Sequence, residues 1–174
     1  IVSNQHEAQI IVINTCGFIE SAKEEAIQTI LEMAELKQTA KCQFLIVTGC
    51  LVKRYQKELE KALPEVDLFI SVDEYDEIWC KIENLLDLPR KSKNTLDYLD
   101  RTISTGDKTA YLKIAEGCSN HCTYCAIPSI RGPYISRPME EILKEARHLA
   151  DLGYQEIIVI AQDTTKYGID LYGK

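Results

Sequence analysis

Long apolar stretches and a leader sequence are both missing from this chain of 174 residues. No run approaches the roughly 18–20 apolar residues that a membrane-spanning helix needs. The first residues form neither a basic segment nor an apolar one, so there is no sign of a signal peptide. We therefore expect a cytoplasmic protein with no membrane partner. Position 1 is Ile1 rather than methionine, and we expect a fragment of a longer protein.

Positive charge is also scarce: the chain has 20 Lys and Arg residues and 27 Asp and Glu residues, so its net charge is −7. That is a poor electrostatic footprint for a protein that binds nucleic acid through its phosphates.

The seven cysteines are odd in number and do not form the framework of a disulfide-rich protein. In a chain that is not secreted, clustered cysteines more often bind metal or react than cross-link.

What the chain does have is a group of three cysteines, Cys118, Cys122 and Cys125, in a C-x3-C-x2-C pattern after an apolar stretch. Soft thiolates at this spacing suit an iron–sulfur cluster or zinc. A structural zinc site needs four protein ligands, and no fourth cysteine follows closely. A four-iron cluster held by three thiolates leaves one iron open for a substrate or cofactor. The pattern therefore favours an open [4Fe–4S] cluster, with a zinc site completed by His121 or a distant ligand as the alternative.

Apolar runs alternate with helical patterns in the first half of the chain. Strands are predicted over residues 9–14, 42–47 and 67–72. The first is a continuous apolar run, as expected of a strand buried on both faces. An amphipathic helix follows each strand, and Ser21 with Glu24 forms a possible capping box at the start of the first helix. The alternation predicts a doubly wound parallel sheet in an N-terminal α/β domain over residues 1–88.

A polar and basic stretch over residues 89–109 is typical of a linker. A second α/β segment follows over residues 110–174, with strands at 110–114 and 156–160 and a helix at about 139–152. The cysteine group comes directly after the first of these strands, where α/β barrels place their chemistry. Two strands are too few to close a barrel, so we expect the truncated beginning of a (β/α) partial barrel.

Two further cysteines, Cys16 and Cys50, each follow a predicted strand and stand beside a glycine. Ligands gather beyond the carboxyl ends of strands in an open parallel sheet, so these two thiols can meet in space. Cysteine also packs well as a small buried apolar group, and the residues alone leave both interpretations open. Two thiolates are too few for a typical cluster, so a third would come from outside this chain. Cys42 and Cys80 lack such a setting and are expected to be structural.

Candidate cofactor contacts lie near the cysteine group and after the last predicted strand. Arg131 and Arg137 follow the cysteines, and one of them can hold a carboxylate by a bidentate bond; loop solubility is the alternative. Gln162 and Asp163 lie on the catalytic face expected of a barrel, with helix capping by Asp163 as the alternative. We take Arg137, Gln162 and Tyr124, the aromatic residue before the third cysteine, as the cofactor-binding candidates.

Residues 117–125 resemble the radical S-adenosylmethionine signature, and the chain resembles the methylthiotransferase family of that superfamily. Residues 14–19 and 47–50 resemble two of the three cysteine motifs in the N-terminal domain of the family. Residues 111–118 resemble the beginning of its radical SAM domain. The first of the three N-terminal cysteines would fall before Ile1, so we expect the fragment alone to be inactive.

The resemblance implies two [4Fe–4S] clusters and S-adenosyl-L-methionine as cofactors. Cys118, Cys122 and Cys125 would be the catalytic set, holding the cluster that cleaves S-adenosylmethionine to a radical. That radical would abstract hydrogen from an unactivated carbon, which no side-chain base can do. Cys16 and Cys50, with the absent cysteine, would hold an auxiliary cluster that presents a methylated sulfur to the carbon radical.

Within the family, residues 127–132 and 162–168 resemble the branch that modifies the β-carbon of an aspartate in the small-subunit ribosomal protein of the decoding centre. The branch that modifies an adenosine of transfer RNA usually has an asparagine where Asp163 stands, and it is the alternative. The expected partners are that ribosomal protein and a flavodoxin- or ferredoxin-type reductant. An electron-transfer iron–sulfur protein and a zinc-stabilised binding module are alternatives from other classes.

Overall fold

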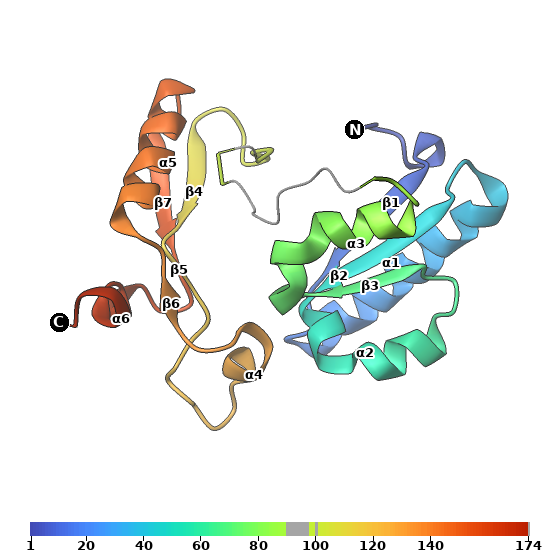
Figure 1. The fold of residues 1–174 in the computed structure, drawn as a ribbon, viewed down its shortest axis with the longest axis horizontal. Coiled ribbons are helices and arrows are strands. Elements are labelled where there is room, and N and C mark those ends of the chain that lie inside the picture. The colour runs from blue at the N-terminus through green and yellow to red at the C-terminus, as the bar shows by residue number, and fades with distance from the viewer. Residues whose placement is uncertain (90–97, 100, 174) are drawn as a thin grey trace. The chain divides into compact units, whose positions relative to one another are not determined.

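The structure, a computed structural model, describes residues 1–89, 98–99 and 101–173. The chain divides into two compact units, Ile1–Leu96 and Asp97–Lys174, and each is described by itself (Figure 1). Residues 90–97 and 100 of the predicted linker lie outside the described residues. No helix in the described part of the chain is long and apolar enough to cross a membrane.

A three-stranded parallel sheet forms the centre of the first unit. Its strands lie in the order β1 (Ile10–Thr15), β2 (Phe44–Gly49) and β3 (Leu68–Ser71). The helices of this unit are η1 (Gln5–Glu7), α1 (Glu20–Thr39), α2 (Cys50–Ala62), η2 (Val72–Glu77) and α3 (Ile78–Leu85). Figure 1 shows α1 and α3 on opposite faces of the sheet, so the predicted doubly wound arrangement is confirmed.

The main core of this unit lies between the sheet and the helices α1 and α2. Leu45, Val47 and Phe69 from the strands pack in one buried cluster with Ile30 of α1 and Leu59 of α2. Burying a side chain of this size contributes roughly 1.5–3 kcal/mol. This cluster therefore fixes the two helices against the strands and sets where the strand ends lie.

The first strand is not buried on both faces, so that prediction is wrong. In the described residues β1 pairs with β2 alone, which makes it an edge strand. Ile11 and Ile13 pack against the core, whereas Ile10 and Val12 remain 38% and 50% exposed. A continuous apolar run does not distinguish a central strand from an edge strand with one open face.

The predicted capping box of Ser21 and Glu24 does not form either. The N-cap of α1 is Ile19, which makes no side-chain cap hydrogen bond, so Ser21 already lies within the first turn. A capping box forms instead at Ser71 and Glu74, where the Glu74 carboxylate accepts a bond from the Ser71 N–H at 2.9 Å. This box turns the chain at the carboxyl end of β3.

The second unit is built on one strand–helix–strand crossover. β4 (Thr109–Lys113) and β7 (Glu156–Ile160) pair in parallel, and α5 (Met139–Asp151) lies between them in sequence, each within one residue of its predicted range. The remaining elements are the antiparallel pair β5 (Ala115–Glu116) and β6 (Ile135–Ser136), and the helices α4 (Ile127–Arg131), η3 (Thr164–Lys166) and α6 (Ile169–Tyr172). The cysteine group lies between β5 and β6.

A buried ion pair joins α5 to the end of β4. Arg137 is 8% exposed and Glu145 is 1% exposed, and the guanidinium donates to the carboxylate at 2.7 Å and to the Lys113 carbonyl at 2.5 Å. Arg101 lies 3.2 Å from the same carboxylate, and the Tyr98 ring centroid lies 3.7 Å from the Arg137 guanidinium. Because a buried charge without its partner is costly, removing either Arg137 or Glu145 alone should destabilise this unit.

Candidate functional site

The three clustered cysteines occupy one loop between β5 and β6. Cys118 is buried at 9% exposure, Cys125 is half-buried and Cys122 is exposed. The Cys125 N–H donates to the Cys122 carbonyl at 3.0 Å, which turns the chain between the last two cysteines. His121 is exposed and has φ 49°, so it forms a left-handed bend at the surface of the loop.

The two ends of this loop are held together at its base. β5 pairs with β6, and the Cys118 N–H donates to the Gly132 carbonyl at 3.1 Å. Gly117 has φ 71°, and a Cβ there would lie 2.0 Å from the Pro133 carbonyl oxygen. Only glycine fits this position, and the first cysteine is therefore placed by backbone contacts.

Asn120, between the first two cysteines, joins the loop to the segment after β7. Its side-chain N–H donates to Asp163 at 2.9 Å, and the Lys166 ammonium donates to its side-chain oxygen. Asp163 also accepts from the Thr165 N–H at 3.1 Å and so caps η3. Hydrogen bonds from the Thr165 and Asn120 side chains hold the pKa of Asp163 below its usual value. Asp163 is thus a helix cap, one of its two predicted roles, and it also holds the cysteine loop.

A polar pocket of about 270 Å³ opens beside the carboxyl ends of β4 and β7. It is lined by Lys113, Ala115, Glu116, Arg131, Ile160, Ala161 and Gln162. The Glu116 carboxylate lies 2.6 Å from the Lys113 ammonium and 3.6 Å from the Arg131 guanidinium. Burial by itself would raise the pKa of Glu116, but the bond from Lys113 and the charges of Lys113 and Arg131 lower it below its usual value. Charges of both signs thus line one pocket and pair with one another there.

The three predicted cofactor-binding residues lie in different settings. Gln162 lines this pocket, whereas Tyr124 stands on the cysteine loop with 88% of its surface exposed. Arg137 faces the buried carboxylate of Glu145, and it is Arg131 that reaches the pocket. Sequence reasoning missed the pocket residues at the end of β4, because a charged residue at a strand end has no distinctive pattern.

In the first unit, Cys16 and Cys50 leave the sheet at neighbouring strand ends. The residues before them, Thr15 and Gly49, are register partners in the parallel ladder of β1 and β2. Neighbouring strands lie about 4.8 Å apart, so the two cysteine segments begin side by side. Cys16 is exposed and Cys50 is 9% exposed.

Backbone contacts pack these two cysteine segments closely. A Cβ on Gly17 would lie 2.7 Å from the Leu51 Cα, and a Cβ on Gly49 would lie 2.3 Å from the Thr15 carbonyl oxygen. The glycine beside each cysteine is therefore required by close approach. Cys42, in contrast, is 4% exposed, and burial raises the pKa of its thiol, as expected of a structural cysteine.

The donor chemistry of both sets suits a soft metal or an iron–sulfur cluster. In the described part of the chain, no three His, Cys, Asp or Glu side chains already stand together as a metal site. Cys118, Cys122 and Cys125 supply three thiols from one short loop with a rigid base, which fits a cluster with one open iron. Cys16 and Cys50 supply two thiols and fit a cluster only with a further ligand.

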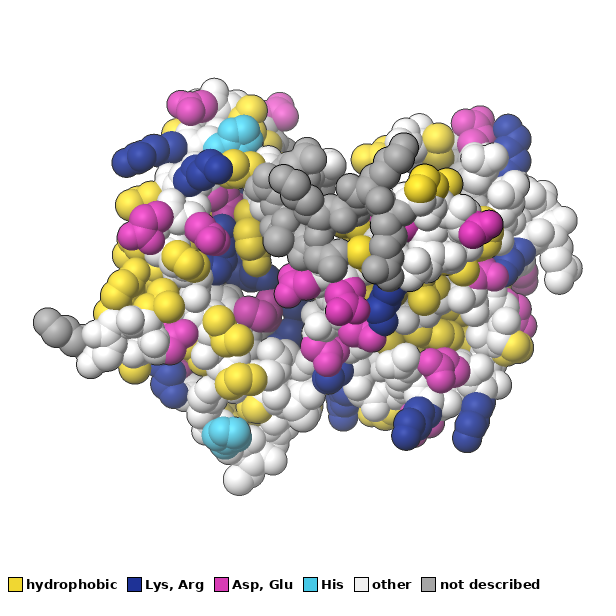
Figure 2. All heavy atoms as spheres, viewed as in Figure 1, with side chains coloured by type: hydrophobic (Ala, Val, Ile, Leu, Met, Phe, Trp, Pro, Cys, Tyr) yellow, Lys and Arg dark blue, Asp and Glu magenta, His cyan; other side chains and the backbone are white. Residues whose placement is uncertain are grey.

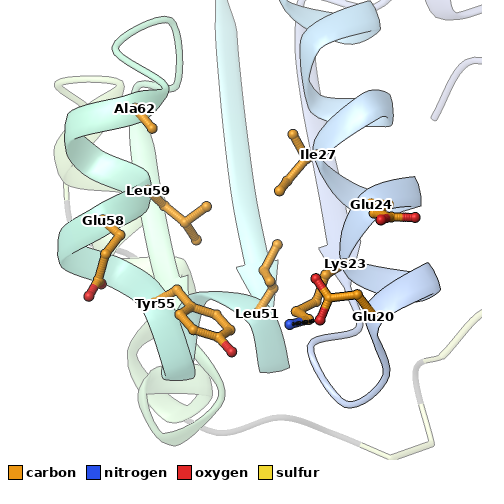
Figure 3. Close-up of a pocket in the computed structure, with 9 residues that line it drawn as sticks. All are labelled: Glu20, Lys23, Glu24, Ile27, Leu51, Tyr55, Glu58, Leu59 and Ala62. Carbon is orange, nitrogen blue, oxygen red and sulfur yellow. Dashed lines mark ion pairs between the residues drawn. The ribbon is translucent and has the colours of Figure 1, made fainter.

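A second hollow, of about 320 Å³, lies between α1 and α2 (Figure 3). Ile27, Leu51 and Tyr55 give it largely apolar walls. Lys23 closes one side, since it pairs with Glu20 and lies 5.3 Å from the Tyr55 ring centroid. Its described lining residues include neither cysteine nor histidine, so it is a poor candidate for the reactive site.

Comparisons with known proteins follow the same division of the chain. The family model described as uncharacterized protein family UPF0004 matches residues 1–71, and the radical SAM superfamily model matches residues 112–173. The chain is 69% identical over 174 residues to the ribosomal protein uS12 methylthiotransferase RimO of Alkaliphilus oremlandii. Along its whole length the chain is RimO-like. The proteins with the same name from Clostridium botulinum and Clostridioides difficile are 52% and 51% identical over 180 residues.

These RimO matches cover 100% of this chain and 40% of each relative, so the chain spans about two fifths of the length of its curated relatives. The UPF0004 match contains Cys16 and Cys50, and the radical SAM match contains Cys118, Cys122 and Cys125. The predicted fold is confirmed as an α/β chain with parallel sheets that runs into the beginning of a radical SAM domain.

Proposed function

We propose that this chain carries iron–sulfur ligands of a radical SAM methylthiotransferase that modifies ribosomal protein uS12. The observation that supports this most is the 69% identity to a RimO protein over the entire chain. Cys16 and Cys50 also lie at the carboxyl ends of parallel strands, and the cysteine loop follows the parallel strand β4 after the short strand β5. The carboxyl ends of parallel strands are where α/β proteins bind ligands and place chemistry.

On this proposal, Cys118, Cys122 and Cys125 hold a [4Fe–4S] cluster. When bound and reduced, such a cluster supplies the electron that cleaves S-adenosylmethionine, so that an unactivated C–H bond can be attacked. The protein places the three thiols: Gly117 fixes the base of the loop, and Asn120 joins the loop to the segment after β7.

The pocket beside β4 and β7 then binds the amino acid end of S-adenosylmethionine. Arg131 offers the fork of donors that pairs with a carboxylate, and Glu116 offers a carboxylate to an ammonium group. Gln162 supplies a donor and an acceptor from the same side chain. The ionic groups of the cofactor would replace the bonds that Lys113, Glu116 and Arg131 make with one another.

For the first unit, we propose that Cys16 and Cys50 bind a second [4Fe–4S] cluster together with one further thiolate. This auxiliary centre would provide the sulfur that is added to the β-carbon of an aspartate in uS12. A flavodoxin- or ferredoxin-type protein would be the electron donor, and the reaction would take place in the cytoplasm. Figure 2 shows both acidic and basic side chains on the face drawn, and the net charge of −7 favours a protein substrate over transfer RNA.

The test uses the full-length protein, reconstituted anaerobically with iron and sulfide. After one-electron reduction with dithionite, electron paramagnetic resonance should show a cluster whose signal changes when S-adenosylmethionine is added. We expect Cys118→Ala to lose that change and to abolish methylthio transfer to uS12, measured by mass spectrometry. Cys42→Ala, which removes a buried thiol of the first unit, is the matched control and should retain both.

Each alternative gives a different result in this experiment. A cluster signal that ignores S-adenosylmethionine indicates electron transfer, and a colourless protein that binds zinc indicates a binding module. A Cys118→Ala protein with an unchanged response would show that the ligand assignment is wrong. A gene deletion that spares uS12 modification but removes the modified adenosine from transfer RNA would assign the chain to the other branch.

A further inference from the structure

Arg54 lies one helical turn after Cys50 on α2 and reaches the other cysteine segment. Its Nη1 donates to the Gly17 carbonyl at 2.7 Å, between residues 37 positions apart in sequence. Gly17 directly follows Cys16, and a Cβ on it would lie 2.9 Å from the Cys50 carbonyl carbon. The guanidinium therefore links the segment that carries one cysteine to the helix that carries the other.

Two other features fix the position of this guanidinium. Tyr55, the next residue, has φ −134° and ψ 24°, so α2 bends directly after Arg54. The Tyr55 ring centroid lies 5.1 Å from the guanidinium carbon, within the range of a cation–π contact. The N-cap of α2 is Gly49, which has no side chain to bond the neighbouring backbone. At the start of α2, Arg54 thus supplies the side-chain bond to the Cys16 segment that the cap residue Gly49 cannot supply.

We propose that Arg54 is a positioning residue for Cys16 and Cys50, which keeps their two segments at the spacing that a shared metal centre needs. The inference rests on the proposed function of this centre and adds a residue to it. A bond that orients a ligand segment typically changes metal affinity by about 10–100-fold. The charge of Arg54 also favours the anionic form of a thiolate-ligated cluster, and charge is one of the factors that set a cluster's potential.

Lys53 provides a matched control, because its removal takes away the same charge from the adjacent position. Its ammonium lies 2.5 Å from the Asp73 carboxylate, so its bond goes to the segment after β3 rather than to Gly17. An effect of charge alone should appear in both Lys53→Ala and Arg54→Ala. An effect of the Gly17 bond should appear only in Arg54→Ala.

The first experiment uses full-length protein freed of metal. Dibromobimane, a short reagent that links two thiols, should join Cys16 to Cys50, as measured by peptide mass spectrometry. We expect Arg54→Ala to slow this linking about tenfold, because the two segments lose their fixed separation. The linking rate of Lys53→Ala should stay within about twofold of the wild-type rate, which is too small a change for the loss of a positioning bond. Arg54→Gln, which keeps a shorter donor, replaces the alanine variant if circular dichroism shows that the latter is unfolded. Linking at the wild-type rate in the folded variant would overturn the proposal.

The second experiment measures iron in a full-length protein whose three loop cysteines are alanine, so that the remaining iron reports on the first unit. Arg54→Ala should lose this iron to a chelator about ten times faster than Lys53→Ala. Arg54→Lys should restore part of the retention, since it keeps a donor of similar length. If Cys16→Ala retains all of the iron, the cluster proposed for the first unit is wrong, and the linking experiment still decides the role of Arg54. If Arg54→Ala changes neither linking nor iron loss while Cys16→Ala loses the iron, only the role of Arg54 is refuted.

Discussion

In the first unit the cysteines come from two strand ends, Cys16 after β1 and Cys50 at the start of α2. In the second unit all three lie within one loop, between β5 and β6. The ladder of β1 and β2 sets where the first pair lies, so that site depends on the whole packed sheet. The close backbone approach at Gly117 and the bond from Asn120 to Asp163 set where the loop cysteines lie. The first site thus depends on the packed core and the second on a surface loop, so different substitutions should damage each.

The largest predicted effect concerns the buried ion pair of Arg137 and Glu145 in the unit that carries the cysteine loop. Glu145→Ala leaves the buried Arg137 guanidinium without its carboxylate, and removing one partner of a buried pair costs roughly 3–5 kcal/mol. We expect hydrogen exchange to accelerate in α5 and β4 of the second unit. Fluorescence of Trp79, the single tryptophan, should show unchanged unfolding of the first unit.

A double variant, Arg137→Met with Glu145→Leu, separates packing from charge. It should recover most of the lost stability, because apolar residues of similar volume often replace a buried ion pair without cost. A double variant as unstable as Glu145→Ala would mean that the network around Arg101 and Tyr98 needs the guanidinium itself.

The next effect tests the sheet-edge site. Gly49→Ala places a Cβ 2.3 Å from the Thr15 carbonyl oxygen at φ 112°. Strain and overpacking together predict a loss of about 3 kcal/mol in the free energy of unfolding. The measurement is urea unfolding followed by Trp79 fluorescence, with thiol linking of Cys16 to Cys50 as a second readout.

Gly153→Ala is the control for this substitution. Gly153 has φ 93°, but a Cβ there would meet nothing within 4 Å. It should lose only the roughly 1–2 kcal/mol of an unfavourable backbone conformation, in the second unit, where hydrogen exchange rather than Trp79 fluorescence measures the loss. Equal losses for the two variants would show that the close approach of β1 and β2 does not matter at this position.

The smallest effect is a dependence on pH in the first unit. Burial by itself would raise the pKa of Glu74, but bonds from Lys81 and from the Ser71 N–H lower it below its usual value. Its charged form therefore stabilises the unit above about pH 4.3, the ordinary value for glutamate. This stabilisation is lost as the pH falls through the lower value of the folded state.

We therefore expect wild type to be more stable than Glu74→Gln at neutral pH, and the difference to shrink between about pH 5 and pH 3. The free energy of unfolding, measured across this range, checks the prediction. Lys81→Met removes the bond from Lys81 to Glu74 and should make the free energy of unfolding depend less on pH over this range. A difference that grows as the pH falls would contradict the assignment.

Much of the fold follows from the sequence because its elements have strong local patterns. Apolar runs and helical periodicity mark each strand and helix of the three strand–helix–strand crossovers, and the cysteine spacing marks the loop site. The errors occur where tertiary context decides. The exposed face of β1 depends on which strand neighbours it, and the capping box of α1 fails because the helix begins before Ser21.

The supporting residues of the two sites are harder to predict from sequence. Arg54 and Gly17 are 37 positions apart, and Asn120 and Asp163 are 43 positions apart, so no local pattern joins them. Their one sequence signal is proximity to a cysteine motif: Arg54 lies a helical turn beyond Cys50. Such contacts become visible only when the strand ends are brought together.

The short β5–β6 ladder has a consequence for engineering. Because Ala115 pairs with Ser136 and Cys118 bonds back to Gly132, residues 117–134 begin and end at nearly the same place. The segment can therefore be exchanged as one piece: a donor segment with matching ends should keep the β5–β6 pairing, and it needs an equivalent of Asn120 to keep the bonds to Asp163 and Lys166. Chimaeras that exchange only residues 117–134 would reveal which of these side chains change the properties of a bound metal group and which are only exposed to solvent.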